Sequence, residues 1–111
     1  MIKNGKKILI TKTTTLTTTY QQFLGLRGKT ISKQEAYIFP LTTTSRFLAI
    51  VDMFFMKEPL LILWLANNKI VDIQQAQPWN IYLPQQAANK IIEVHPANKN
   101  KFKKGQQLTI T

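Results

Sequence analysis

The feature that most constrains the fold is an apolar run, LLILWL, at residues 60–65. A strand with one solvent-exposed face alternates apolar and polar residues. An uninterrupted apolar run is therefore typical of a strand buried on both faces. Asn67 and Asn68 follow, and asparagine tolerates the positive φ that a two-residue hairpin turn needs. Residues 70–73 then provide the partner strand. We therefore expect a β-hairpin at the centre of a β-rich core.

Further strands and two short helices are expected around this hairpin. Threonines 18 and 19 each precede a glutamine by three residues, a capping pattern for a short helix that would end at Gly25. Pro84 can open a second short helix through Lys90. β-branched and apolar residues predict strands over residues 7–15, 36–39, 46–56, 78–84, 91–94 and 108–111. The expected fold is mainly β, a compact antiparallel barrel or sandwich of about seven short strands with two short helices.

Length and composition fit one domain over residues 1–111. The hydrophobic content of 44% lies in the globular range, and a chain of this length can bury about two-thirds of its unfolded surface. There is no cysteine, which excludes a disulfide framework, a thiolate metal site and a cysteine nucleophile. No apolar run approaches eighteen residues and the N-terminus lacks a signal-peptide core, so we expect no membrane span. We expect the chain to be soluble, cytoplasmic as given, and exported if an N-terminal signal has been removed.

The net charge of +10 raises the question of an anionic partner. Thirteen of the fifteen basic residues are lysines, and the sequence is also rich in Ile, Asn, Gln and Thr, so compositional bias explains the charge equally well. Only two arginines are present, although arginine forks are usual in nucleic-acid sites. Weak binding to nucleic acid or an anionic surface is therefore the alternative interpretation. Its residues would be Lys99, Lys101, Lys103 and Lys104, joined by Lys3, Lys6 and Lys7.

Catalytic and metal-binding patterns are weak. His95 is the only histidine, which excludes a multi-histidine metal site, and neither Ser32 nor Ser45 lies in a nucleophile elbow. Asp52 interrupts an apolar segment but has no second carboxylate nearby in sequence, so a turn or bulge role is favoured over acid–base work. We assign no catalytic residue, metal or cofactor. An enzyme whose scattered acids and His95 converge in space is the third interpretation.

The leading interpretation is a non-enzymatic module that binds a small ligand or a protein. Trp79 alternates with Ile81 and Leu83 between two prolines and is expected to plug the core. Tyr82 lies on the opposite side of this segment and is expected to be open to a ligand. Glu93 interrupts the apolar strand 91–94 and is expected to face solvent or to form a salt bridge. The candidate ligand-binding residues are Trp79, Tyr82, Glu93 and His95.

The order of several short motifs is similar to that of an uncharacterised family, the DUF192 proteins. The motifs are Gly25-Leu26, Phe54-Phe55-Met56-Lys57, Pro59-Leu60 with the apolar strand, Ile70-Val71, Pro78-Trp79 with Tyr82, and residues 91–94. The Pro-Trp-x-x-Tyr form resembles a shorter variant in archaea. The resemblance implies a compact β-rich domain with short helices and supplies no agreed activity.

The chain departs from the pattern of that family at three places. It has Leu61 where an acidic residue is usual, and Gly105-Gln106 where Gly-Asp is usual. The glycine expected after the strand 91–94 is also missing, and residues 95–98 read His-Pro-Ala-Asn instead. Any activity that rests on those two carboxylates is therefore in doubt for this chain.

Overall fold

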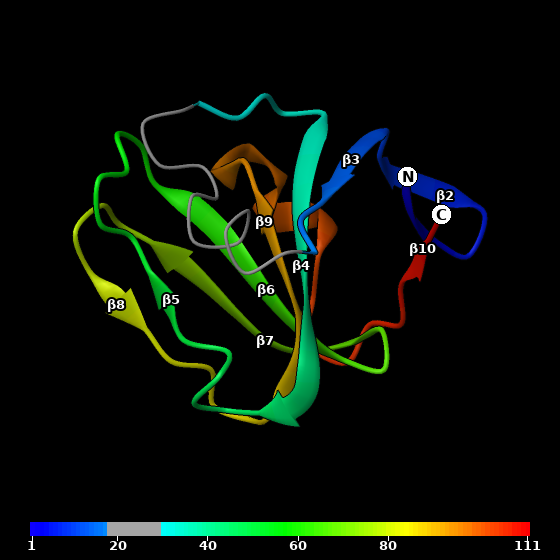
Figure 1. Ribbon diagram of the computed structural model, residues 1–111. Helices are drawn as coiled ribbons and strands as arrows, with labels where there is room; N and C mark the ends of the chain where they lie inside the picture. The colour runs from blue at the N-terminus through cyan, green and yellow to red at the C-terminus, as the bar shows by residue number, and fades with distance from the viewer. Residues whose placement is uncertain (18–29) are drawn as a thin grey trace.

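The computed structural model of the protein describes residues 1–17 and 30–111, which form three β-sheets and one short helix (Figure 1). The described elements are β1 (Ile2–Asn4), β2 (Lys7–Ile10), β3 (Lys12–Thr15), β4 (Glu35–Ser45), β5 (Val51–Asp52), β6 (Leu60–Ala66), β7 (Lys69–Ala76), β8 (Ile81–Tyr82), β9 (Ala88–Val94), the 3-10 helix η1 (Pro96–Lys101) and β10 (Thr109–Ile110). The mainly β prediction is confirmed.

The predicted central hairpin is confirmed. β6 and β7 pair antiparallel from Leu60↔Ala76 to Ala66↔Lys69, and both turn residues have positive φ, 53° at Asn67 and 65° at Asn68. Two positive φ values are what a tight hairpin needs to match the twist of its strands. β6 is buried at its first six positions because it lies inside the five-stranded sheet, whose order is β3-β4-β9-β6-β7.

Each face of this five-stranded sheet has its own apolar core. On one face, Leu61, Leu63 and Ile92 pack with Ile2 and Leu9, which belong to the three-stranded sheet β10-β1-β2. On the other face, Ile62, Trp64 and Ile91 pack with Ala49, Val51 and Met53. The apolar run at residues 60–65 is therefore needed in full, because alternate residues fill two different cores.

The second core is closed by the chain between β4 and β6. Trp64 is fully buried, and its indole Nε1 donates a hydrogen bond of 2.7 Å to the carbonyl oxygen of Ala49. Arg46 Nε donates to the carbonyl oxygen of Pro84 at 2.9 Å, which links this segment to the chain before β9. β5 then pairs with β8 as a separate two-stranded sheet, which we call the β5–β8 ribbon (Figure 1).

Three architectural predictions are wrong. β3 and β4 pair in parallel, so the fold is not purely antiparallel. None of the three sheets formed by the described residues closes into a barrel. The helix predicted from Pro84 to Lys90 is absent, because residues 88–90 already belong to β9 and pair with β4 and β6. The described part contains only η1 as a helix, and the helix predicted to end at Gly25 lies outside the described residues.

Several strand boundaries also differ from the predictions. The segment 7–15 is divided between β2 and β3, which belong to different sheets. β4 continues past Pro40 to Ser45 with an irregular register, beyond the strand predicted over residues 36–39. Only Val51–Asp52 is a strand within residues 46–56, and only Ile81–Tyr82 within residues 78–84. Among the described residues, no helix has the length and apolar character to cross a bilayer.

Candidate functional site

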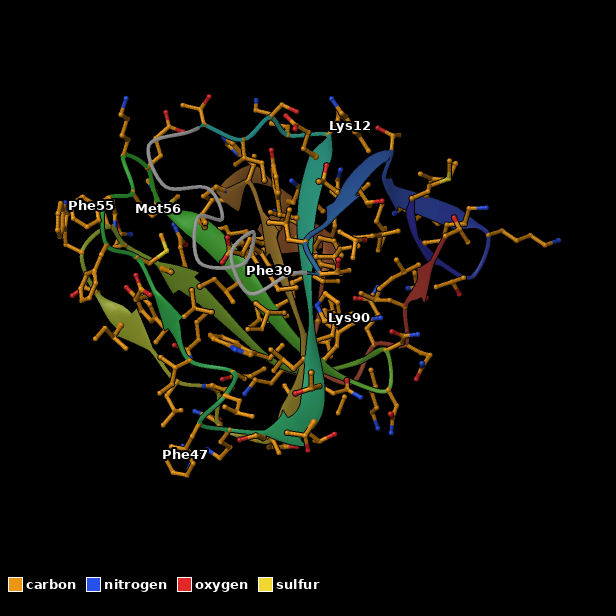
Figure 2. The ribbon with its side chains drawn as sticks, in the orientation of Figure 1. Lys12, Phe39, Phe47, Phe55, Met56 and Lys90 are labelled. Carbon is orange, nitrogen blue, oxygen red and sulfur yellow. The ribbon has the colours of Figure 1, made fainter. Side chains whose placement is uncertain are left out.

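Exposed apolar side chains gather on the segments next to the β5–β8 ribbon. Of eight large hydrophobic residues exposed in the described part of the chain, seven lie within residues 47–55 and 79–81; Ile8 is the other. We call these seven the apolar surface: Phe47, Leu48, Ile50, Phe54, Phe55, Trp79 and Ile81. Figure 2 shows Phe55 at the left edge of the molecule and Phe47 at its lower edge, at opposite ends of the segment that contains β5. Large exposed apolar patches mark interaction sites more often than single exposed residues do.

Three aromatic rings lie together at one end of this surface. The Phe55 and Trp79 ring centroids are 4.9 Å apart, and those of Phe54 and Trp79 are 6.2 Å apart. Trp79 is 59% exposed and Phe55 is 65% exposed. Both phenylalanine rings therefore lie against Trp79, and we call these three rings the aromatic cluster; more than half of the Phe55 and Trp79 side chains remains exposed.

Backbone hydrogen bonds around Met53 hold the aromatic cluster in place. Met53 N donates to the carbonyl oxygen of Asn80 at 2.8 Å, and its own carbonyl accepts from Trp79 N at 2.8 Å and Met56 N at 3.3 Å. Phe55 and Trp79 have φ values of 63° and 68°, a left-handed conformation that bulky residues rarely adopt. Such strain costs about 1–3 kcal/mol per residue and clusters at functional sites.

A pocket of about 130 Å³ lies beside the apolar surface. Six apolar side chains and two carboxylates line it: Phe39, Leu41, Leu48, Ile50, Val51, Ile91, Asp52 and Glu93. Phe39 and Ile91 in this lining are buried side chains of the second core. Leu48 and Ile50 belong to both the pocket and the apolar surface, so the two features are continuous. Asp52 and Glu93 thus line one pocket although they are far apart in the sequence.

The four candidate ligand-binding residues lie in different settings. Trp79 is exposed, so the prediction that it plugs the core is wrong; the buried tryptophan is Trp64. Tyr82 is half-buried against the second core, and its hydroxyl accepts a hydrogen bond of 2.7 Å from Gln77 N. Glu93 is buried and lines the pocket, so of its two expected settings, facing solvent or forming a salt bridge, the first is wrong. His95 caps η1 through Nδ1, which accepts from Ala97 N at 3.0 Å.

The seven lysines of the alternative interpretation lie on other elements than the apolar surface. Lys3, Lys6 and Lys7 belong to the β1–β2 hairpin, and Lys99 and Lys101 to η1. Lys101 Nζ donates to the carbonyl oxygen of Leu9 at 3.2 Å, which joins these two groups. Lys103 and Lys104 follow η1, but Lys104 Nζ lies 3.3 Å from Asp72 Oδ1. Lys104 therefore contributes an ion pair to the fold.

Asp72 is a buried charged residue that the sequence analysis did not single out. Its carboxylate accepts hydrogen bonds from Ile73 N, Gln74 Nε2 and Gln85 N, all within 3.0 Å. Burial raises the pKa of the Asp72 carboxyl, but the hydrogen bonds from Gln74, Gln85, Ile73 and Lys104 together hold that pKa below its usual value. Asp72 pairs with Trp64 and lies on the face of the second core, whereas Ile70 pairs with Leu65 in the first core, because the register of β6 and β7 shifts between them. Simple alternation along the sequence would have placed both residues on one face. Asp72 has a structural role.

The geometry offers two chemical possibilities. The aromatic cluster can contact apolar groups of a partner, and the pocket can enclose a small group. Within residues 1–17 and 30–111, no three His, Asp or Glu side chains gather in a way that could hold a metal ion.

Comparison with known proteins gives a family and a fold. The family model DUF192, described as "Uncharacterized ACR", matches residues 1–110. Among curated relatives, a UPF0127 protein of Thermococcus sibiricus is 34% identical over 77 residues, 68% of this chain and 49% of the relative. A UPF0127 protein of Pyrococcus horikoshii is 38% identical over 71 residues, 63% of this chain and 60% of the relative. Both matches thus span less than two-thirds of the relative's length.

Two solved structures are similar in fold. One is a candidate transcription regulator from Sinorhizobium meliloti 1021, with a TM-score of 0.78 and 17% identity over 87% of this chain and 79% of the other. The second is a protein of unknown function from Novosphingobium aromaticivorans, with a TM-score of 0.76 and 19% identity over 88% of this chain and 74% of the other. At these identities the likeness concerns the fold alone.

Proposed function

The chain belongs to the uncharacterised DUF192 family, and from that premise we propose that it is a non-enzymatic module that binds a partner protein through the apolar surface. The observation that carries the proposal is the concentration of seven exposed apolar side chains on two hydrogen-bonded segments. Exposed apolar side chains lower the solubility of the isolated chain and add nothing to its stability. A concentration of them is therefore typical of an interaction site.

The composition of the apolar surface favours a protein partner over a nucleic acid. Residues 47–56 and 78–82 contain no lysine, although the chain has thirteen, and Asp52 is their only charged residue. Protein interfaces are depleted in lysine and enriched in aromatic side chains and methionine, whereas nucleic-acid sites need cations to neutralise phosphates. Tryptophan is also enriched among the residues that dominate binding energy.

The backbone strain at Phe55 and Trp79 supports the same proposal. Both bulky residues hold a positive φ while their side chains remain mostly exposed. Burial of these side chains in the isolated chain therefore offsets little of the free-energy cost of the backbone strain. A partner that buries the rings would supply that missing stabilisation. This arrangement is also preorganised, because backbone hydrogen bonds to Met53 fix the aromatic cluster before any partner arrives.

A peptide library displayed on phage tests the proposal whatever the identity of the partner. We expect selected peptides to bind the wild-type chain and to lose at least tenfold in affinity for Phe55→Ser and for Trp79→Ser. The matched control is Ile8→Ser, which removes an exposed apolar side chain from β2, outside the apolar surface. Each variant is checked for wild-type circular dichroism. Equal affinity of the selected peptides for all four proteins would contradict the proposal.

A second candidate function rests on the lysines of the β1–β2 hairpin and η1, which the Lys101 contact with Leu9 joins. These lysines support weak, nonspecific binding to an anionic polymer such as duplex DNA. Because such binding releases counterions, its affinity should fall steeply with salt, and Lys6→Gln with Lys7→Gln should reduce the slope. Sequence-selective binding that persists at physiological salt would place nucleic acid ahead of a protein partner.

A further inference from the structure

Arg46 lies next to Phe47 at one end of the apolar surface, and its guanidinium is held in one place. Its Nε donates a hydrogen bond of 2.9 Å to the carbonyl oxygen of Pro84, and its Cζ lies 5.9 Å from the centroid of the Phe47 ring. That distance is typical of a cation–π contact. Two contacts therefore position the guanidinium, although Arg46 is an exposed residue.

The backbone around Arg46 is also fixed. Ser45 Oγ accepts hydrogen bonds of 3.1 Å from Phe47 N and from Leu48 N, and the carbonyl oxygen of Arg46 accepts one of 3.2 Å from Ala49 N. Ala49 is fully buried and belongs to the second core. These bonds join the turn to that core, so Arg46 keeps its position before any partner binds.

The positive charge of Arg46 has no carboxylate partner in the described part of the chain. The one salt bridge between two described residues joins Lys104 and Asp72, and no acidic residue within 1–17 and 30–111 pairs with Arg46. Residues 18–29 contain neither Asp nor Glu. An arginine carries five N–H donors, and among the described residues only the Nε–H of Arg46 has an acceptor. The donors on its two Nη atoms are therefore available to an external group.

From these contacts, and resting on the proposed function, we infer that Arg46 binds an aspartate or glutamate side chain of the partner protein. One N–H from each Nη atom can donate to the two oxygens of a single carboxylate, the bidentate arrangement that a planar guanidinium favours. Because two contacts already hold the guanidinium, little side-chain entropy is lost when the carboxylate binds. The net charge of +10 also speeds the approach of an acidic partner.

A carboxylate fits this position better than a phosphate does. Arg46 supplies one positive charge, which one carboxylate balances, whereas a phosphorylated side chain carries about 1.5 to 2 negative charges at neutral pH. Residues 45–56 and 78–84 contain no lysine that could supply a second positive charge. The expected ligand group is therefore a carboxylate.

The position of Arg46 beside the apolar surface limits the sequence of the partner. Phe47 is 71% exposed at the lower edge of the molecule, and Leu48 is 58% exposed, so both can contact apolar groups of the same partner segment (Figure 2). Residues i and i+2 of an extended segment are about 6.5 Å apart. This spacing is close to the 5.9 Å between Arg46 Cζ and the Phe47 ring centroid. The partner segment should therefore contain an acidic residue within two positions of an apolar one.

Binding of three synthetic peptides to the ¹⁵N-labelled chain tests the inference. The peptides are acetyl-Leu-Asp-Phe-Leu-amide and its counterparts with asparagine or phosphoserine in place of aspartate. We expect the aspartate peptide to shift the amide resonances of Arg46, Phe47 and Leu48 and to bind at least fivefold tighter than the asparagine peptide. Equal affinity of these two peptides would refute the inference. Binding of the phosphoserine peptide at least fivefold tighter than the aspartate peptide would overturn the choice of a carboxylate.

Variants show whether the preference for aspartate over asparagine belongs to Arg46. Arg46→Gln should abolish this preference, and Arg46→Lys, which keeps the charge but not the fork of donors, should leave less than half of it. The matched control is Lys57→Gln, which removes an exposed cation just beyond the other end of the segment 47–55 and should leave the preference unchanged. A preference that persists in Arg46→Gln would contradict the inference.

The comparison of the peptides on the wild-type chain needs no variant, so the test holds even if Arg46→Gln fails to fold. Failure of this inference is also distinguishable from failure of the proposed function. If peptides selected from the phage library required Phe55 and Trp79 but bound Arg46→Gln as tightly as the wild type, the proposed function would stand and the role of Arg46 would be refuted.

Discussion

The two tryptophans should contribute very differently to stability. Trp64 is fully buried and hydrogen-bonded to Ala49, so Trp64→Ala should lower the free energy of unfolding by about 3 to 5 kcal/mol. Trp79 is 59% exposed, and a fully buried tryptophan covers up to about 250 Å². The buried part of the Trp79 side chain is then about 100 Å², which stabilises the fold by at most about 2.5 kcal/mol. Because the unfolded chain already buries some apolar area, we expect Trp79→Ala to lower the free energy of unfolding by about 2 kcal/mol.

Comparing alanine with glycine at position 79 isolates the backbone strain. Both substitutions remove the same ring, but only glycine adopts a φ of 68° without a steric cost. We therefore expect Trp79→Gly to be about 0.5 to 1 kcal/mol more stable than Trp79→Ala, the reverse of the usual order. Urea unfolding followed by circular dichroism measures all three variants. If Trp79→Ala destabilises as much as Trp64→Ala, or if glycine is worse than alanine, the assignment of Trp79 to a strained surface position is wrong.

Two further substitutions test the hairpin and the buried carboxylate. Asn68→Val should lower the free energy of unfolding in urea by about 1 kcal/mol or more, because valine resists a φ of 65°. Asn68→Gly loses the same hydrogen bond from Lys90 but tolerates this φ, so it should cost less. Equal losses of stability in the two variants would exclude backbone strain as the cause. Asp72→Asn should cost about 3 kcal/mol at pH 7, because a charged acceptor of several hydrogen bonds is lost. The pKa of Asp72 is lower in the folded than in the unfolded chain, so its contribution to the free energy of unfolding is complete above the unfolded pKa of about 4 and is lost as pH falls through the folded pKa. The stability advantage of the wild type over Asp72→Asn should therefore shrink only under acid conditions. A constant stability difference from pH 7 to pH 2 would contradict this.

The core was more predictable from the sequence than the surface. Residues 60–65 and the two asparagines predict a doubly buried strand and a tight turn because burial and positive φ leave direct traces in residue type. No residue type around Trp79 indicates in the same way that its side chain is exposed. Its alternation with Ile81 and Leu83 indicated a buried face, but the left-handed turn at Trp79 interrupts the strand and directs the ring outward.

The pocket could not be predicted because it depends on contacts between distant segments. Asp52 and Glu93 line one pocket only after β5 packs over the sheet that contains β9, and neither residue has an acidic neighbour in sequence. The missing helix after Pro84 has a similar cause. Residues 88–90 favour a helix locally, but pairing with both β4 and β6 satisfies their backbone groups in a strand.

The most direct test of the proposed binding surface is to map a selected peptide on the ¹⁵N-labelled chain by chemical-shift perturbation. Our account predicts that the largest shifts fall within residues 47–55 and 79–81, and that Trp79→Ser abolishes them while the protein remains folded. Shifts confined to the lysines of the β1–β2 hairpin and η1, or an unchanged pattern in Trp79→Ser, would contradict it.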